Sequence, residues 1–230
     1  MPRLIATRQP RDPVGVALIL HGGGGRGGVP VSPTQLSVLR MVPIAVRVAR
    51  AGHGRIAVYR LLNAVRGVGA DPLSNVRWAL GQLAVDYAGL DVCLVGHSLG
   101  GSVALAAAGE SQVRGVVALA PWLAGSERTR HLAQTRTLIV HGTNDRITSC
   151  RGSQQYAART RQGGAPVSFV EVERGEHSML RRMLAFDVLA AHYSHAVLDP
   201  EHAGRQARGF RSRLERLAVE ACDTPADYRI

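Results

Sequence analysis

Short apolar runs alternate with longer segments of helical periodicity along most of the chain. Six runs of aliphatic and β-branched residues predict strands at 14–20, 56–61, 92–95, 113–119, 137–140 and 167–172. Most of these runs are nearly continuous in apolar residues, as expected for parallel strands that are covered on both faces. The segments between them predict helices at 35–51, 72–87, 98–108, 153–162 and 178–195. This alternation indicates an α/β fold with a doubly wound, mostly parallel sheet of about six to eight strands flanked by helices.

Proline positions bear on two of these helices. Pro72 follows Asp71, which suits a first helical turn with an aspartate as N-cap. Pro43 lies inside the segment 35–51 and should kink or divide that helix, because proline lacks the amide hydrogen that a helix interior needs.

A chain of 230 residues is long enough to bury the core of one domain. We assign residues 1–198 to this domain and interpret 199–230 as an Arg-rich, C-terminal helical tail of the same domain. Within the tail, apolar residues recur at roughly helical spacing, namely Phe210, Leu214, Leu217 and Val219. This spacing predicts a helix that packs one apolar face, with an interaction surface as the alternative.

The formal net charge is +11, and all 28 basic residues are arginine. A basic chain raises the question of nucleic acid, but these arginines are scattered and aromatic residues make up only 4% of the sequence. Base-stacking platforms are therefore scarce, and we expect no nucleic acid as the main partner. The positive field is still suited to attract anionic substrates.

The cysteines and the first apolar run bear on the compartment. Three cysteines are an odd number, so they imply no disulfide framework. The run at 14–20 is too short to span a bilayer and lies too far along the chain for a secretory signal. We expect a cytoplasmic protein without membrane insertion, and the sequence leaves its oligomeric state open.

The stretch DVCLVGHSLGGSVALAAAG, residues 91–109, has the pattern of a nucleophile elbow. A buried strand runs into G-x-S-x-G, with the serine at Ser98, and a helix of small residues follows at once. Such a turn is strained and lifts the Ser98 hydroxyl above the end of the strand. Side chains two residues to either side would collide with neighbouring backbone, which accounts for Gly96 and Gly100. A plain strand-to-helix turn with a capping serine is the alternative, but it does not explain these glycines.

With these residues the chain resembles the α/β-hydrolase family, and the resemblance covers most of residues 14–196. It rests on the loop at 21–24, the elbow GHSLGG, VHGTNDRIT at 140–148 and RGEHSML at 174–180. The family implies a catalytic triad in the chain order Ser, acid, His. In this family a lid is most often inserted after the strand that follows the elbow helix. Here only PWLAGSERTRHLAQTR, residues 121–136, stands at that point, so we expect no large cap domain.

The resemblance places the acid and the base of the triad on two loops. Asp145 follows the strand at 137–140, at the family's position for the acid, and a simple Asn-Asp turn is the alternative. His177 follows the strand at 167–172 and lies 32 positions after Asp145, which leaves room for one helix and one strand. Both side chains are therefore expected at the sheet edge where Ser98 lies. His21 and His141 are expected to shape loops.

Residues 18–28, LILHGGGGRGG, contain the pattern G-x-G-x-x-G at Gly22, Gly24 and Gly27. A dinucleotide-binding loop would open directly into a helix and carry an acidic residue roughly 20 positions later. Here two prolines delay the helix, and no Asp or Glu stands between Asp12 and Asp71. No Gly-Lys-Ser/Thr of a phosphate-binding loop follows either. We therefore interpret the stretch as an oxyanion loop, whose glycines let the backbone approach a substrate.

The family implies two backbone N–H donors for the oxyanion. One belongs to Leu99, the residue after the nucleophile, and the other to the glycine loop, where Gly23 is the first choice. The residues expected to bind substrate are two further glycines of the loop, the variable residue of the elbow and a tryptophan after the next strand, namely Gly22, Gly24, His97 and Trp122. For the tryptophan, simple packing beside the preceding proline is the alternative.

Together these residues predict a serine hydrolase that cleaves carboxylic esters or thioesters of small substrates through an acyl-enzyme. Ser98 is the expected nucleophile, His177 the base and Asp145 the residue that orients the base. No metal and no organic cofactor is implied. Peptidases and acyltransferases share this machinery, and a non-catalytic ligand-binding protein on the same fold is a further alternative.

Overall fold

The structure is a computed structural model, which describes residues 1–23, 28–66, 71–125, 127–207, 209 and 212–230. Within these residues an eight-stranded sheet is built from β1 (Arg3–Arg8), β2 (Gly15–Leu20), β4 (Ile56–Leu62), β6 (Val92–His97), β7 (Val113–Leu119), β8 (Arg136–Gly142), β9 (Val167–Val172) and β10 (Asp227–Arg229). Their order across the sheet is β1-β4-β2-β6-β7-β8-β9-β10. The edge strand β1 runs antiparallel to β4, and the remaining neighbours in this described sheet pair in parallel.

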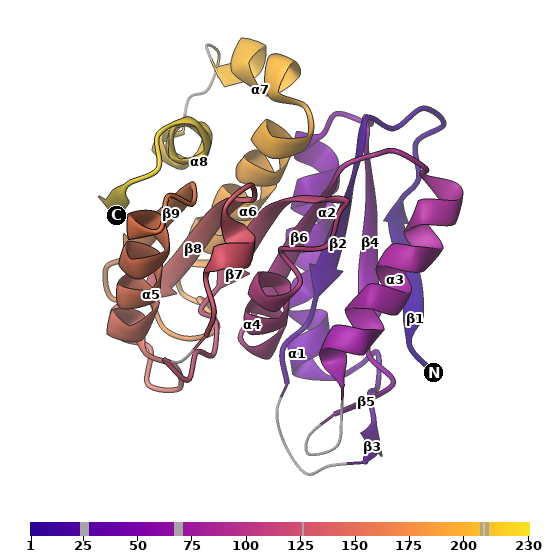
Figure 1. The fold of residues 1–230 in the computed structure, drawn as a ribbon, viewed down its shortest axis with the longest axis horizontal. Helices are drawn as coiled ribbons and strands as arrows, with labels where there is room; N and C mark the ends of the chain where they lie inside the picture. The colour runs from indigo at the N-terminus through magenta and orange to yellow at the C-terminus, as the bar shows by residue number, and fades with distance from the viewer. Residues whose placement is uncertain (24–27, 67–70, 126, 208, 210–211) are drawn as a thin grey trace.

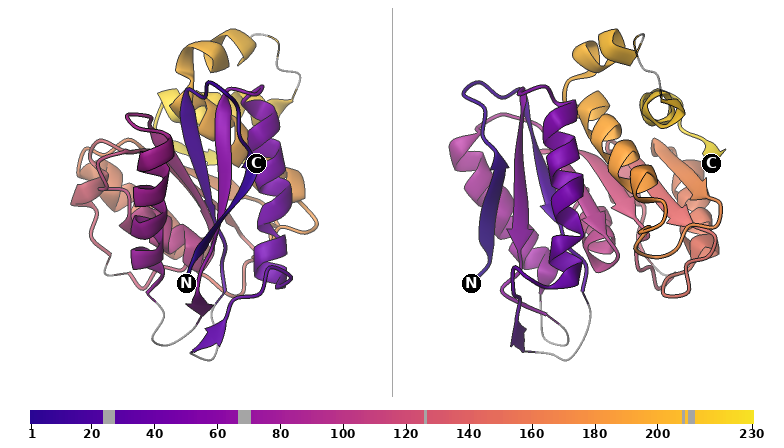
Figure 2. Two further views of the ribbon diagram at one scale, coloured as in Figure 1. Left: turned by 90° about the vertical axis from the view of Figure 1, so that its right-hand side faces the viewer. Right: turned by 180° about the vertical axis from the view of Figure 1, so that it is seen from behind.

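Helices cover both faces of the sheet (Figures 1 and 2). One face carries α2 (Met41–Ala51), α6 (Met183–Leu198) and α8 (Arg213–Asp223). The other face carries α3 (Pro72–Asp86), α4 (Leu99–Ala106) and α5 (Cys150–Gln162). Every residue of β2 and of β6 is buried as a result. This two-sided cover explains why the central strands read as continuous apolar runs and not as alternating ones.

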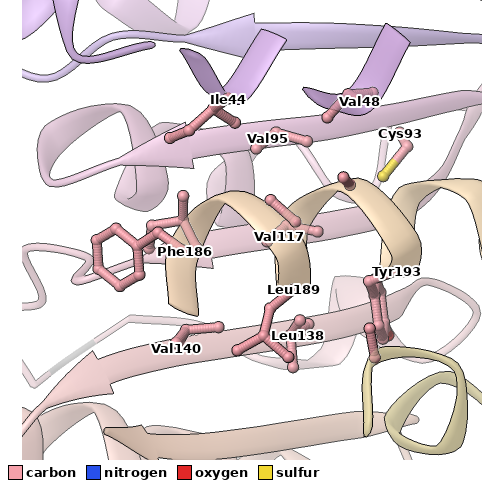
Figure 3. Packing of buried hydrophobic residues seen from close by; sticks show 14 of the residues in the cluster. Ile44, Val48, Cys93, Val95, Val117, Leu138, Val140, Phe186, Leu189 and Tyr193 are labelled. Carbon is pink, nitrogen blue, oxygen red and sulfur yellow. The ribbon is translucent and has the colours of Figure 1, made fainter. Parts of the chain in front are cut away.

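Helix α6 crosses the middle of its face and is buried along nearly its whole length. It packs against α2, α8 and the sheet. Figure 3 shows Phe186, Leu189 and Tyr193 of this helix among side chains of the strands, such as Val117 and Leu138. A helix that is apolar all round must be covered on all sides, and α8 supplies part of that cover.

All six predicted strands are present, as β2, β4, β6, β7, β8 and β9. The two edge strands were not predicted, for reasons that lie in their composition. In β1 (RLIATR) the apolar residues are interrupted by arginine and threonine and are only partly buried, and β10 has just three residues. A short ribbon of β3 (Val29–Pro30) and β5 (Val65–Arg66) was also not predicted.

The helices agree with the sequence pattern except at some of their ends. The first predicted helix divides, as expected, into α1 (Leu36–Leu39) and α2. Pro43 lies in the first turn of α2, where its missing amide hydrogen costs no helical bond. Asp71 caps α3, because its carboxylate accepts a hydrogen bond from the N–H of Ser74. Helix α6 begins at Met183 and not at 178. None of the helices in the described ranges combines the length and the apolar character needed to cross a membrane.

The C-terminal segment returns to the sheet. After α7 (Pro200–Ala207), the helix α8 opens with a capping box between Ser212 and Glu215. Its buried residues are Leu217, Ala218, Ala221 and Cys222, and they join the cluster under α6. Strand β10 then pairs with β9. Phe210, which belongs to the expected apolar face, lies outside the described residues.

The segment between β7 and β8 determines how open the carboxyl edge of the sheet is. Over residues 120–125 and 127–135 the structure holds a 3-10 helix, Arg130–Leu132, and no longer helix or strand. A cap domain is therefore missing at the position where α/β folds of this kind would carry one, as the sequence predicts.

The contact between the end of β8 and the loop after β9 gives a test of this packing. An added Cβ at Gly142 would lie 2.1 Å from the carbonyl oxygen of Gly175, a backbone atom that cannot move aside alone. We expect Gly142→Ala to lower the free energy of unfolding by about 2–3 kcal/mol, within the range for overpacked interiors. Urea unfolding curves with an unchanged m-value measure this loss.

A second glycine serves as the matched control. Gly81 lies within α3, and an added Cβ there meets nothing within 4 Å. Gly81→Ala should raise the free energy of unfolding by about 0.5–1 kcal/mol, because alanine favours the helix. Two variants of equal stability would contradict the tight contact at Gly142.

Candidate active site

Ser98 occupies the sharp turn between β6 and α4. Its backbone has φ 55° and ψ −121°, a strained conformation for a residue that carries a side chain. The turn is held on both sides, since the N–H of Ser98 donates to the carbonyl of Leu119 and its own carbonyl accepts from the N–H of Gly101. Ser98 is half-buried at the carboxyl end of β6. The serine thus has the backbone geometry that a nucleophile elbow requires.

Two glycines allow this turn, because backbone from other segments fills the space that their side chains would need. An added Cβ at Gly96 would lie 2.1 Å from the carbonyl oxygen of Gly100. One at Gly100 would lie 2.5 Å from the carbonyl oxygen of Leu20, at the end of β2. The first contact sets α4 against β6, and the second presses the elbow against β2. The spacing of glycines around the serine is therefore a requirement of space.

Asp145 lies on the loop after β8, and hydrogen-bond donors enclose its carboxylate. Its Oδ2 accepts from the Thr148 hydroxyl at 2.7 Å, from His177 Nδ1 at 2.8 Å and from His141 Nε2 at 3.0 Å. Its Oδ1 accepts from the backbone N–H of Ile147 at 2.8 Å and of Thr148 at 2.9 Å. The side chain has no exposed surface. A carboxylate with this many donors is well satisfied although it is buried.

The hydrogen bonds also determine the charge of Asp145. Burial alone would raise the pKa of its carboxyl, but the hydrogen bonds from His141, His177 and the loop N–H groups outweigh burial and hold the pKa well below its usual value. Asp145 is therefore an anion at neutral pH. Its charge lies against Nδ1 of His177, the geometry that orients a catalytic imidazole.

His177 comes from the loop after β9, and the backbone joins this loop to the Asp145 loop. The N–H of Thr143 donates to the carbonyl of Val172, the last residue of β9, at 3.0 Å, and the N–H of Asn144 donates to the carbonyl of Gly175 at 2.9 Å. These bonds extend the pairing of β8 and β9 beyond the strands themselves. They set Asp145 and His177 facing each other although the two residues are far apart in the chain. The His177 side chain is 14% exposed, while that of Asp145 is closed to solvent.

His97, the variable residue of the elbow, packs under His177. Its Nε2 donates to the backbone carbonyl of His177 at 2.9 Å, and the two rings have their centroids 4.8 Å apart. Burial lowers the pKa of His97 to about 4, against a smaller raising effect of the hydrogen bond to His177. The ring is therefore neutral at pH 7 and supports the His177 loop. Only 6% of His97 is exposed, so it offers little surface to a substrate.

His21 orients the start of the glycine loop. Its Nδ1 donates to the carbonyl of Gly22 at 2.7 Å, and its Nε2 accepts from the N–H of Asn63 at 3.2 Å. Burial lowers the pKa of His21, which agrees with a neutral ring that donates at one nitrogen and accepts at the other. Because the C=O and N–H of a trans peptide point in opposite directions, the N–H of Gly23 points away from His21.

The glycine loop contacts the elbow directly. An added Cβ at Gly22 would lie 2.9 Å from the His97 carbonyl oxygen and 3.1 Å from Cβ of Ser98. Gly23 follows with φ 123°, a conformation that a residue with a side chain rarely adopts. Gly24 lies outside the described residues, as do residues 25–27. The structure therefore brings Gly22 beside the serine, and the space next to Gly23 is bounded by Ser37, whose Oγ would lie 3.2 Å from an added Cβ.

Leu99 and Trp122 both adjoin Ser98. Leu99 is the first residue of α4, so its N–H is among those that the helix leaves unbonded. The N–H of Trp122 donates to the Ser98 carbonyl at 3.3 Å, while 59% of the tryptophan is exposed. The Ser98 hydroxyl itself forms no hydrogen bond with any residue that the structure describes, His177 included.

Two residues that hold Asp145 were not recognised from the sequence. His141, expected only to shape a loop, donates to the carboxylate through Nε2, while its Nδ1 accepts from the Ser153 hydroxyl at 2.8 Å. Thr148 was not singled out, yet its hydroxyl lies within hydrogen-bond distance of both Asp145 and His177. The available signal is their place in VHGTNDRIT, four positions before and three positions after the aspartate.

Comparisons with solved structures bear on the fold. One similar structure is an α/β serine hydrolase homologue from Coxiella burnetii, with 21% identity, a TM-score of 0.59 and coverage of 83% of this chain and 90% of that chain. Another is an α/β serine hydrolase without lid from Xanthomonas campestris, with 18% identity, a TM-score of 0.59 and coverage of 92% and 89%. A third is an α/β hydrolase enzyme from a Medee basin deep-sea metagenome library, with 19% identity, a TM-score of 0.65 and coverage of 86% and 93%.

The chain has the α/β-hydrolase fold. The mostly parallel sheet flanked by helices agrees with this fold, as the sequence predicts, and the similar structure from Xanthomonas campestris is likewise described as lacking a lid. No family model matches the sequence, and no curated protein does. At the identities of the solved structures the likeness extends to the α/β-hydrolase fold alone. What the site does must therefore be argued from its own geometry.

Thr148 gives a test of the network around the carboxylate. Thr148→Val replaces the hydroxyl that donates to Asp145 Oδ2 by a methyl group of similar size. We expect the free energy of unfolding to fall by about 1.5–3 kcal/mol, the scale of a hydrogen bond to a charged group. The loss should be full above about pH 4, the pKa of an unfolded aspartate, and should shrink as the pH falls toward the lower pKa of the folded carboxyl. Urea unfolding at several pH values measures it.

Thr135 supplies the matched control for this prediction. Its buried hydroxyl donates to the carbonyl of Ala108, a neutral acceptor remote from Asp145. Thr135→Val should cost about 1 kcal/mol with no comparable dependence on pH between 3 and 7. Losses of equal size and equal pH dependence in the two variants would speak against a charged acceptor at Thr148.

Proposed function

We propose that this protein is a serine hydrolase that cleaves carboxylic esters or thioesters of small substrates through an acyl-enzyme. The observation that carries the proposal is the hydrogen bond between His177 Nδ1 and the buried, ionised Asp145, beside a strained elbow that presents Ser98. A serine hydroxyl is a poor nucleophile alone, and an oriented imidazole is the group that activates it. In proteins without bound substrate the serine–histidine contact is often long and tightens on binding.

The proposed reaction has two halves. Ser98 Oγ attacks the carbonyl carbon of the substrate while His177 Nε2 takes the hydroxyl proton. The bond from carbon to the leaving oxygen or sulfur then breaks, and His177 returns its proton to the leaving alcohol or thiol. A water molecule, deprotonated by the same nitrogen, then attacks the acyl carbon. The bond from that carbon to Ser98 Oγ breaks, His177 returns the proton to Oγ, and the carboxylic acid is released. Asp145 orients the imidazole throughout and stabilises its charged form.

The tetrahedral intermediate needs two N–H donors for its oxyanion. The N–H of Leu99, at the start of α4, is one, and the helix dipole adds to it. The N–H of Gly23 is the other. His21 binds the carbonyl of Gly22, so the Gly23 N–H of the same peptide points away from His21 and can donate to the oxyanion. Gly22 lies against Ser98 and lets the loop approach the reacting carbon.

The open carboxyl edge favours short acyl groups. Burial of each methylene is worth about 0.8 kcal/mol only where there is a wall to bury it against. The described part of the segment between β7 and β8 supplies no cap, and Trp122 beside the elbow is largely exposed. The similar structures include an esterase domain from Rhodothermus marinus and an arylesterase, and these names support esters as the substrate class. Peptide cleavage and acyl transfer would use the same groups.

Replacement of the serine tests the proposal. Ser98→Ala should lower kcat for 4-nitrophenyl acetate by at least about 1,000-fold, because the triad acts as a unit. The melting temperature should change little, since the hydroxyl forms no hydrogen bond with the described residues. Ser111→Ala, at an exposed serine outside the site, should keep full activity and labelling by a fluorophosphonate probe.

Three outcomes distinguish the alternatives. Undiminished hydrolysis by the Ser98→Ala protein would remove Ser98 as the nucleophile. Absence of turnover and of fluorophosphonate labelling in the wild-type protein would favour a ligand-binding role on this fold. Labelling confined to Ser98, together with ester turnover, supports the hydrolase.

A further inference from the structure

A cluster of three polar side chains lies at the end of the sheet opposite to Ser98, where α6 gives way to α7 (Figure 1). His195 belongs to the last turn of α6, Asp199 joins the two helices and His202 belongs to α7. One potential ligand atom of each residue lies within 4.8 Å of those of the other two.

His195 is the residue in this cluster that calls for an explanation. Its side chain is fully buried, and neither ring nitrogen has a hydrogen-bond partner among the residues that the structure describes. Buried polar nitrogens without partners are rare and costly. Nε2 of His195 lies 4.0 Å from Asp199 Oδ2, and His202 Nδ1 lies 3.8 Å from the same oxygen. These two separations exceed the edges of a tetrahedral zinc site by roughly 0.5 Å, and the widest one in the cluster, up to 4.8 Å, exceeds them by roughly 1.5 Å, so the side chains must move toward one another to bind a metal.

Two neighbours complete the surroundings of the cluster. The ring of His53, from the exposed turn after α2, stacks on His202 with centroids 5.8 Å apart and lies 6.3 Å from the ring of His195. Arg55 Nε donates to Asp199 Oδ2 at 2.6 Å and is the counter-charge of this carboxylate in the structure. Its side chain is 44% exposed, so it can turn outward when a cation takes its place.

We propose that His195, Asp199 and His202 bind a divalent transition metal, with zinc as the best match. Imidazole and carboxylate donors suit Zn²⁺ and its analogue Co²⁺. The metal bonds the His195 nitrogen that otherwise has no partner. It ties α6 and α7 together at the amino ends of the strands. The site is structural and takes no part in ester cleavage.

Titration of the metal-free protein with Co²⁺ tests the site, because a tetrahedral Co²⁺ complex has intense visible absorption. We expect one Co²⁺ per chain, displaced by Zn²⁺, and a rise in melting temperature on binding. His202→Ala, at a partly exposed residue, should weaken binding by at least about 100-fold. Arg55→Gln should strengthen it several-fold, because it removes the group that competes for the Asp199 oxygen.

A histidine in the candidate active site and one on the 3-10 helix serve as controls. Binding that is unchanged in His177→Gln and in His131→Gln places the metal outside the active site and away from the surface histidines. Binding that survives His202→Ala but is lost in His177→Gln would overturn the proposal, as would the lack of any saturable binding by the wild-type protein. Circular dichroism of each variant shows whether it is folded.

A second inference rests on the proposed function and on a different part of the surface. A groove of about 870 Å³ extends from His177 along the loops after β8 and β9. Four exposed arginines line it, namely Arg146, Arg174, Arg181 and Arg182. Within the described chain, none of their guanidinium groups forms an ion pair or a hydrogen bond. Glu176 is the one acidic residue in the lining, and its Oε1 accepts from the backbone N–H of Arg181.

We propose that the group that leaves on cleavage carries a phosphate or a similar anion, which these arginines bind. His177 is the residue that returns a proton to the leaving alcohol or thiol, so a groove that begins at His177 receives the leaving part of the substrate. One guanidinium group can donate two parallel hydrogen bonds to the oxygens of a phosphate, and it remains charged at any physiological pH. Ile147 and Leu180, also in the lining, give apolar contacts to the chain that connects the ester to the anion.

Two acetate esters that differ in charge test this proposal. We expect kcat/KM for 4-acetoxyphenyl phosphate to exceed that for its neutral dimethyl ester by about 10-fold or more at low ionic strength, and the advantage to shrink in salt. Replacing both Arg181 and Arg182 by Gln should remove the advantage and leave the neutral ester unaffected. The matched control replaces Arg3 and Arg11, exposed arginines near the other edge of the sheet, and should keep it.

The pair of esters separates the two proposals. Cleavage of both esters with equal kcat/KM would keep the hydrolase and overturn the anion site. Cleavage of neither, by a folded protein, would count against the proposed function itself.

Discussion

Backbone packs directly on backbone at the carboxyl edge of the sheet, and the arrangement of the candidate site depends on it. Gly100 meets the end of β2, Gly96 meets Gly100, and Gly142 meets the loop at Gly175. At each point the missing side chain lets two segments approach closer than any other residue type allows. The loops that carry the serine, the aspartate and the histidine are thus set by the packing of main chain. The positions of these three side chains therefore follow from the packing of the sheet.

The carboxylate of Asp145 is the second organising element of the site. Of the side chains that bond it, the sequence indicated His177 but not His141 or Thr148. His177 is the partner that the proposed triad requires, whereas His141 and Thr148 satisfy the remaining lone pairs of the carboxylate. A buried anion would be costly without them. Their hydrogen bonds allow the aspartate to stay charged inside the protein, next to an imidazole that is only partly covered. The histidine can then exchange a proton with the outside while its partner cannot.

The sequence was sufficient for the parts of the fold and site in which one strong pattern dominates. Continuous apolar runs identified the central strands, and the elbow motif placed Ser98 on a strained turn because its glycines have a steric cause. The sequence was insufficient where the pattern of residues is common to many different structures. The edge strand β1 reads RLIATR, a pattern equally suited to a loop, and β10 is too short to show a period. Thr148 looks like any loop threonine until the fold turns its hydroxyl toward Asp145. The cluster at His195 joins residues whose spacing spans a break between two helices, which no helical period reveals.

The two edge strands of the sheet affect how copies of the chain can meet. An edge exposes unpaired N–H and C=O groups that invite a strand from another molecule. Here one edge strand begins and ends in arginine, and the other is three residues long with Asp227 and Arg229 at its ends. A strand from another molecule would meet only short stretches of backbone with charged residues at their ends. Two copies of the chain also repel each other, because each has a formal net charge of +11. Growth of the sheet from molecule to molecule is therefore opposed at both of its borders.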